Sequence, residues 1–196
     1  MKILKIDLDT LASVLQEVLR VLRKGGVVVC PTDTVYGFLA DATNRKAVQK
    51  VFQIKKREHI KPLPVFVKDI QMAKRLALIS RTQERFLQKV WPGKVTAVLQ
   101  SKHVLGKGFE QEGKIGLRIP NHSLARELLG RFKRPLTGTS ANISGASSCR
   151  DAREVVAQFR QRKYQPDLIL DEGKLPFSRS STVVDITKRK KKIIRV

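Results

Sequence analysis

The 196-residue sequence has only two cysteines, few aromatic residues and no long apolar run. No segment approaches the roughly 20 apolar residues that a transmembrane helix needs, and residues 1–10 lack the apolar centre of a secretory signal. We therefore expect a cytoplasmic protein with no membrane partner, in which Cys30 and Cys149 stay reduced. The three histidines have no metal-ligand spacing with one another or with a cysteine, which argues against a zinc site.

Acidic residues are also scarce: 17 Asp and Glu stand against 40 Lys and Arg, and the net charge is +23. Such a field attracts polyanions. Two explanations stay open, a solubilising surface or contact with nucleic acid or nucleotide phosphates. The densest cationic stretch is residues 188–192. Aromatic residues make up 6% of the chain, which leaves few stacking platforms for single-stranded nucleic acid.

Alternating helix and strand patterns predict one α/β domain over residues 1–196. We expect Asp9, Asn44, Asp69 and Thr82 to cap four of the helices. Further helices are expected to begin at Ser123 and to span residues 151–162. The predicted strands are residues 27–30, 63–67, 95–99, 115–119, 135–139, 167–170, 182–186 and 192–196.

Two segments look like catalytic motifs but lack an essential residue. Residues 108–114 have the spacing of a phosphate-binding loop, but Ile115 stands where a hydroxyl should hold magnesium. Residues 138–142 resemble a nucleophile elbow around Ser140, but Asn142 replaces the second glycine. Neither segment therefore predicts a site of its own.

Polar clusters follow or open three of the predicted strands, and ligands gather where strand ends and loops converge. Any one cluster could simply cap a turn. Three of them in one small domain predict a pocket for a polar ligand, because hydroxyls and amides bind phosphate or carboxylate. The clusters are Thr32-Asp33-Thr34, the group Ser140, Asn142 and Ser144, and Ser180-Ser181-Thr182.

Cations are concentrated at two further positions. Residues 55–57 read Lys-Lys-Arg and are followed by Lys61, between a helix and a strand. They form either a solvated loop or a site for an anion such as a triphosphate. Arg can donate two hydrogen bonds to phosphate oxygens, and Lys acts as a point charge. Arg118 lies within an otherwise apolar strand and therefore needs a partner, either an internal carboxylate or a bound anion.

Taken together, these segments resemble the YrdC-like family of threonylcarbamoyl-AMP synthases over about residues 10–196. Each motif alone is weak, but the ordered set is highly specific. The motifs are PTDTVYG (31–37), KxR (55–57), KPL (61–63), WPG (91–93), GLRIP (116–120), TSANISG (139–145) and STVVD (181–185).

The resemblance implies a fold and a reaction. The fold is a twisted, open, mixed sheet flanked by helices, with a large central basic cavity. The reaction forms threonylcarbamoyl-adenylate and pyrophosphate from L-threonine, bicarbonate and ATP, with Mg²⁺ bound through ATP rather than by the protein. A separate threonylcarbamoyl transferase machinery then modifies adenosine 37 of transfer RNA, and the basic surface is a candidate for RNA contact.

The resemblance also implies roles for individual residues, matched motif by motif. The catalytic residues would be Lys55, Arg57, Ser140 and Asn142. ATP would be bound by these four together with Lys61, Arg150 and Arg195. Threonine would be held by Thr32, Thr34, Arg118, Ser140 and Ser181, with Arg118 facing its carboxylate.

Two positions depart from the family pattern. Phe66 stands where many members have a histidine near the threonine, and Phe38-Leu39 stands where Leu-Gly is usual. Both changes bear on amino-acid specificity more than on the ATP site. Two alternative functions stay open, an RNA-binding protein without catalysis and a YciO-type paralogue of the same fold with different or weak acyl-adenylate activity.

Overall fold

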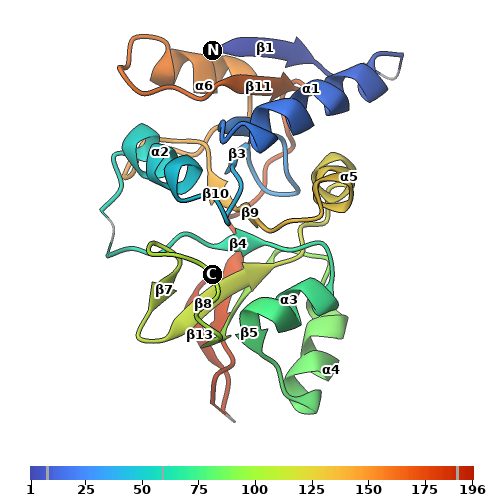
Figure 1. Cartoon of the computed structure of the whole chain (residues 1–196), viewed down its shortest axis with the longest axis vertical. Helices are drawn as coiled ribbons and strands as arrows, with labels where there is room; N and C mark the ends of the chain where they lie inside the picture. The colour runs from blue at the N-terminus through green and yellow to red at the C-terminus, as the bar shows by residue number, and fades with distance from the viewer. Residues whose placement is uncertain (8, 59, 189) are drawn as a thin grey trace.

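Two mixed β-sheets, one above the other along the long axis, organise the chain (Figure 1). This computed structural model describes residues 1–7, 9–58, 60–188 and 190–196. The predicted mixed α/β class is confirmed, with the strands divided between two sheets. No helix within the described ranges is long and apolar enough to cross a membrane.

The upper sheet has the strand order β1-β11-β2-β3-β10 in the described residues. Strand β11 pairs in parallel with both β1 and β2, whereas β3 is antiparallel to β2 and β10. Its strands are β1 (Lys2–Lys5), β2 (Val28–Cys30), β3 (Gly37–Leu39), β10 (Thr139–Ser140) and β11 (Leu168–Asp171).

The lower sheet follows the path β13-β12-β6-β8-β4-β9, with β5 on β6 and β7 on β8, over the described part of the chain. Its outermost strand, β13, is exposed throughout. Its strands are β4 (Val65–Phe66), β5 (Ala77–Leu78), β6 (Val95–Ser101), β7 (Glu110–Gln111), β8 (Lys114–Arg118), β9 (Leu136–Thr137), β12 (Thr182–Asp185) and β13 (Lys192–Arg195).

The helices pack their apolar faces against these sheets. In α1, the buried positions recur every three or four residues, from Val14 to Leu22, as an amphipathic helix requires. That face joins α5 and the upper sheet in one apolar cluster. The helices are α1 (Leu11–Arg23), α2 (Arg45–Lys55), α3 (Ile70–Leu76), α4 (Arg81–Val90), α5 (Ser123–Phe132) and α6 (Ala152–Phe159).

Two of the predicted helix caps are confirmed and two are wrong. Asn44 and Asp69 each accept hydrogen bonds from backbone N–H groups in the first turn of α2 and α3. The N-cap of α1 is Thr10 rather than Asp9. Helix α4 begins one residue before the predicted cap Thr82, because Ser80 and Gln83 form a reciprocal capping box there.

The predicted strand 135–139 is divided between the two sheets. Strand β9 pairs with β4 in the lower sheet, and β10 pairs with β3 in the upper sheet. Gly138 joins them where the ring of Phe66 packs against the backbone, and a Cβ at this position would lie 2.3 Å from Phe66 Cδ1. Only glycine fits here without displacing the ring, so the chain passes close to Phe66 as it crosses from one sheet to the other.

Candidate active site

A pocket of about 120 Å³ lies where loops and strand ends of both sheets converge. The structure brings together seven of the residues predicted from the sequence, from all three polar clusters. These pocket-lining residues are Thr32, Thr34, Arg57, Arg118, Ser140, Ser181 and Arg195.

Seven further pocket-lining residues were not assigned a binding or catalytic role from the sequence. Each of them lies beside a predicted residue or motif in the sequence, so proximity to the motifs was the signal that could have found them. They are Val35, Gly37, Pro64, Phe66, Gly138, Thr139 and Ser180, of which Ser180 belongs to one of the predicted polar clusters.

Lys55 lies behind the pocket wall rather than in its lining. It is the last residue of α2, and its side chain is buried, with the residue only 2% exposed. Its ammonium donates to Ser140 O at 2.6 Å, to Asn142 O at 2.9 Å and to Asn142 Oδ1 at 3.3 Å. Burial, and secondarily the charge of Arg57, lower the pKa of Lys55 to about 7. Lys55 therefore fixes the loop that presents Ser140.

The loop 140–146 is held by a second set of bonds around Asn142, which also lies behind the lining. Ser140 Oγ donates to Asn142 Oδ1 at 2.5 Å. Asn142 Nδ2 donates to Ala146 O at 2.6 Å and to Ile143 O at 3.0 Å. Because every polar atom of the amide is used, the loop presents the Ser140 hydroxyl in one orientation.

Arg57 reaches the pocket just beyond α2. The preceding residue, Lys56, has φ +48° and ends the helix with a left-handed turn. Arg57 Nε and Nη2 donate to the carbonyl oxygens of Lys61 at 2.8 Å and Pro62 at 3.0 Å. Burial and the nearby charge of Arg195 lower the pKa of Arg57. An anion in the pocket would offset both effects.

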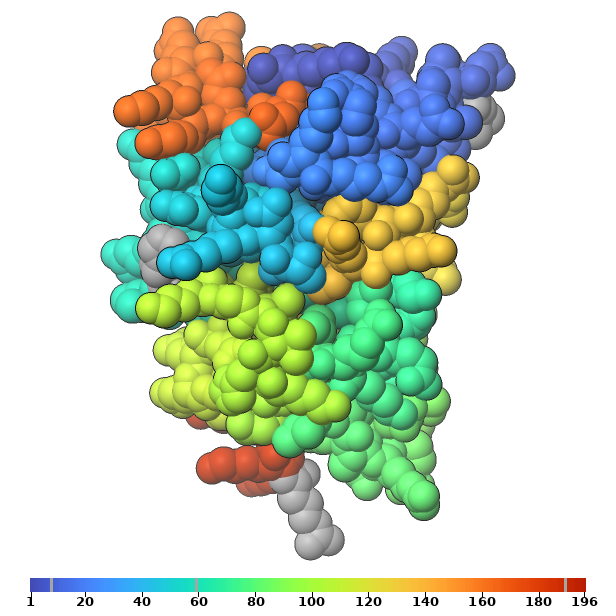
Figure 2. All heavy atoms as spheres, viewed as in Figure 1, coloured from blue at the N-terminus to red at the C-terminus, as the bar shows by residue number. Residues whose placement is uncertain are grey.

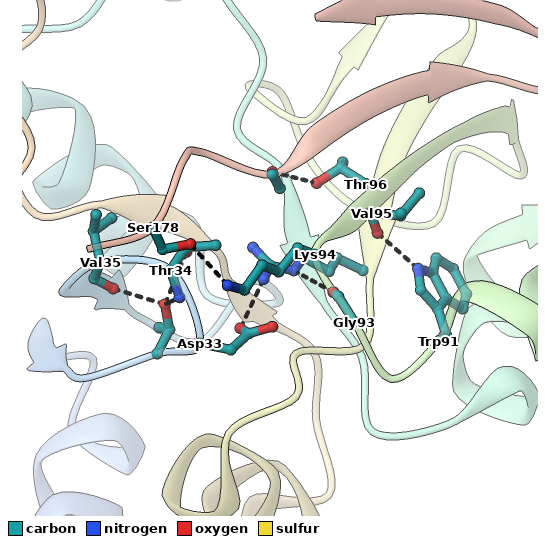
Figure 3. A network of polar contacts seen from close by, with 12 residues as sticks. Asp33, Thr34, Val35, Trp91, Gly93, Lys94, Val95, Thr96 and Ser178 are labelled. Atoms are coloured by element: carbon teal, nitrogen blue, oxygen red, sulfur yellow. Dashed lines mark hydrogen bonds and ion pairs between the residues drawn. The ribbon is translucent and has the colours of Figure 1, made fainter. Parts of the chain in front are cut away.

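Arg118, at the end of β8, has an internal carboxylate partner, which answers the question that the sequence left open. Arg118 Nη2 lies 2.7 Å from Asp33 Oδ1, and Nε donates to Gly93 O at 2.8 Å (Figure 3). The guanidinium also lies over the Phe66 ring, 5.6 Å from its centroid. Both ionic side chains are almost fully buried, at 4% and 7% exposure. Burial lowers the pKa of Arg118, against the opposing effect of Asp33.

Hydroxyl groups also line the pocket and are held by hydrogen bonds. Thr32 Oγ1 donates to Val35 O at 2.6 Å and lies 3.1 Å from Thr34 Oγ1. Ser181 Oγ lies 3.1 Å from Thr96 Oγ1, while Arg195 Nη2 donates to Ser181 O at 2.8 Å. The loop 31–36 and strand β6 thus approach one another across the site (Figure 3).

Besides Lys55 and Asn142, two more residues predicted to contact ATP lie outside the pocket lining. Lys61 is exposed and forms an ion pair with Glu58 at 3.3 Å. The guanidinium of Arg150 lies over the ring of Phe177, 5.5 Å from its centroid. Neither is brought to the pocket by the fold, so any nucleotide contact from them would be made beyond its rim.

No group of three or more His, Cys, Asp or Glu side chains in the described residues could hold a metal ion. Asp33, which follows the pocket-lining residue Thr32, is paired with Arg118. Its Oδ2 atom is buried and has no hydrogen-bond partner among the described residues. This donor set is compatible with a cation that arrives on a ligand's phosphates rather than in a protein cage.

A family model described as "Telomere recombination" and named for Sua5, YciO and YrdC matches residues 20–196. The chain belongs to this Sua5/YciO/YrdC family. A protein of Methanocaldococcus jannaschii with the provisional name threonylcarbamoyl-AMP synthase is 34% identical over 189 residues, 94% of this chain and 86% of that protein.

Two comparisons involve longer proteins of Pyrococcus abyssi. Its threonylcarbamoyl-AMP synthase is 32% identical over 171 residues, 85% of this chain but only 48% of that protein. The crystal structure of P. abyssi Sua5 complexed with L-threonine superposes with a TM-score of 0.89 at 28% identity, covering 99% of this chain and 56% of the other. The chain therefore spans about half the length of these two relatives.

Proposed function

We propose that the chain is a threonylcarbamoyl-AMP synthase, a nucleotidyltransferase that forms threonylcarbamoyl-adenylate and pyrophosphate from L-threonine, bicarbonate and ATP. Its product would serve the modification of adenosine 37 in transfer RNA. The observation that carries this proposal is the pocket between the sheets, where three arginines meet a set of oriented hydroxyls. The names of the relatives and the threonine complex of the P. abyssi protein support it.

The charges around the pocket favour anionic ligands. Arg57, Arg118 and Arg195 face it, and Asp33 neutralises only Arg118. Two positive charges are therefore left in a partly desolvated site, where the charge of Arg195 contributes to the lowered pKa of Arg57. One arginine side chain can donate two parallel hydrogen bonds to two oxygens of a phosphate or carboxylate. A nucleotide triphosphate together with an amino-acid carboxylate would match this arrangement.

We assign the two substrates to different sides of the pocket. The threonine side comprises Arg118 with Thr32, Thr34 and Ser181, and it would hold the carboxylate and hydroxyl groups. The phosphate side is formed by the residues near the end of α2 and the loop after β10. Arg57 and Ser140 line this side, and Lys55 and Asn142 support it from behind the lining. Arg195 lies at the border, and Lys61 and Arg150 lie beyond the rim.

The proposed chemistry needs no side-chain nucleophile. The threonine amine and bicarbonate give a carbamate and water. A carbamate oxygen then bonds to the α-phosphorus of ATP while the bond to the β-phosphate oxygen breaks and releases pyrophosphate. Negative charge grows on the phosphate oxygens during this step, and Arg57 would stabilise it, while Lys55 and Asn142 keep Ser140 in place. When bound through ATP, Mg²⁺ would neutralise further phosphate charge.

Pyrophosphate release tests the proposal directly. The protein is incubated with ATP, bicarbonate and one amino acid at a time, and both pyrophosphate and the adenylate are measured. Release should require threonine and bicarbonate together. Arg57→Ala should lower the rate, whereas Arg126→Ala, which removes an exposed arginine of α5, should not. Release that is independent of threonine would refute the assignment.

Contact with RNA is a second proposal, carried by a different surface. The turn between β12 and β13 exposes Lys188 and residues 190–192 at the lower end of the molecule (Figure 2). Cations on a projecting hairpin can bind phosphates by releasing counterions. Replacing Lys190 and Lys191 by glutamate should weaken binding of transfer RNA and flatten its salt dependence. Pyrophosphate release should be unchanged; an unaltered RNA affinity would exclude this surface.

A further inference from the structure

Phe177 lies exposed beside the candidate active site. At 79% exposure it is the most exposed large apolar side chain among the described residues. A single exposed apolar residue needs no explanation by itself. This ring, however, already has the guanidinium of Arg150 over it, 5.5 Å from the centroid, which is the geometry of a cation–π contact. Most of the ring is left open.

The loop that carries Phe177 is anchored on both sides of the ring. Leu175 N donates to Arg150 O at 2.7 Å, which joins the loop to the segment after β10. Lys94 Nζ donates to Ser178 Oγ at 2.9 Å (Figure 3). These bonds lie two residues before and one residue after Phe177, so they tie the segment that carries the ring to Arg150 and to Lys94.

The pocket between the sheets is too small for a whole nucleotide. Its volume is about 120 Å³, whereas sites for small organic ligands occupy about 300–1,000 Å³. A second hollow of about 370 Å³ adjoins it, lined by Phe177, Lys94 and Val196 among others. Ser180 lines both, so the two hollows lie next to one another at that residue. A ligand with its phosphates at Arg57 that passed Ser180 would reach this hollow.

We propose that Phe177 is the stacking platform for the base of the nucleotide, in a subsite between the Arg150 loop and the adjoining hollow. The inference rests on the proposed function, because it takes ATP as the ligand. Every nucleobase has a π-face that stacks on an aromatic ring. Arg150 adds a cation beside the ring, which would attract the negative charge of a bound nucleotide. The subsite therefore positions the base and discriminates weakly among bases.

The test separates the base from the phosphates. Wild type, Phe177→Ala and Phe177→Trp are titrated calorimetrically with ATP and with inorganic triphosphate, both with Mg²⁺. Stacking on one aromatic ring changes affinity on the order of tenfold or more. Phe177→Ala should therefore weaken ATP binding about tenfold and leave triphosphate binding unchanged. Phe177→Trp keeps an aromatic ring and should bind ATP as the wild type does. Because stacking tolerates any base, GTP should lose affinity in Phe177→Ala as well.

A matched control is available in Tyr164, which is also exposed and also has a cation, Lys163, 5.6 Å from its ring centroid. Tyr164 lies outside both hollows, so Tyr164→Ala should bind ATP as wild type does. Equal ATP affinity in Phe177→Ala and wild type overturns the proposal. So does an equal loss of ATP and triphosphate, which would mark a structural role.

Two further outcomes distinguish this inference from the proposed function. If ATP binding depends on Phe177 but no pyrophosphate is released with threonine and bicarbonate, the subsite stands and the synthase assignment falls. If pyrophosphate is released normally and the KM for ATP is unchanged in Phe177→Ala, the synthase assignment stands and the base subsite is wrong. If Phe177→Ala weakens binding of an RNA oligonucleotide and leaves ATP binding intact, the ring serves nucleic acid and the proposal is wrong.

Discussion

Replacing Lys55 by methionine should change how the stability of the protein depends on pH. Burial lowers the pKa of the folded-state ammonium from 10.5 to about 7. Below pH 7 both the folded and the unfolded chain carry the proton. Between about pH 7 and 10.5 the unfolded chain binds a proton that the folded chain has released, so the free energy of unfolding rises with pH. The buried, charged Lys55 therefore destabilises the fold at neutral pH, and this cost becomes smaller as the pH rises.

The magnitude follows from the same pKa. One pKa unit corresponds to about 1.4 kcal/mol, so raising the pH from 7 to 9 should stabilise the wild type by up to about 3 kcal/mol through this group. Lys55→Met cannot titrate and should lose that increment. At pH 7 the variant also leaves Ser140 O and Asn142 O without their donor, which costs about 1–3 kcal/mol for each buried acceptor.

Urea unfolding followed by circular dichroism at pH 7, 8 and 9 measures the effect. The quantity of interest is the difference in unfolding free energy between wild type and variant, since other titrations cancel in it. Lys89→Met is the matched control, because it removes an exposed lysine from the last turn of α4. If the pH profiles of wild type and Lys55→Met run parallel, the ammonium keeps its proton throughout and the reasoning is refuted.

Three shorter predictions follow from other contacts. Gly138→Ala would place its Cβ 2.3 Å from Phe66 Cδ1 and should destabilise the protein by about 1–3 kcal/mol in thermal unfolding; Gly130→Ala in α5, with open space around it, should stabilise by up to about 1 kcal/mol. Asp33→Ala leaves Arg118 buried and unpaired, and should cost about 3–5 kcal/mol in urea unfolding. Arg57→Ala should lower kcat for pyrophosphate release about 10²–10³-fold, and an unchanged kcat would remove Arg57 from the phosphate side.

The sequence by itself determined the family, the α/β class and most of the secondary structure. Periodicity and caps are local properties, which is why Asn44 and Asp69 were identified as caps and most predicted strands lie close to the observed ones. One wrong cap also has a local cause. Ser80 caps α4 in place of Thr82 because the capping box of Ser80 and Gln83 satisfies the backbone N–H groups of both residues.

Only the tertiary structure decided what each charged group contacts. The partner of Arg118 is Asp33, 85 positions away in the chain. Lys55, which the sequence predicts as a phosphate ligand, donates to a backbone carbonyl behind the pocket lining. The sequence grouped residues 135–139 as one strand, whereas Gly138 divides it between two sheets. Such contacts depend on which strands pair and on how far apart the sheets stand. These properties arise from long-range packing and leave no periodic signal in the sequence.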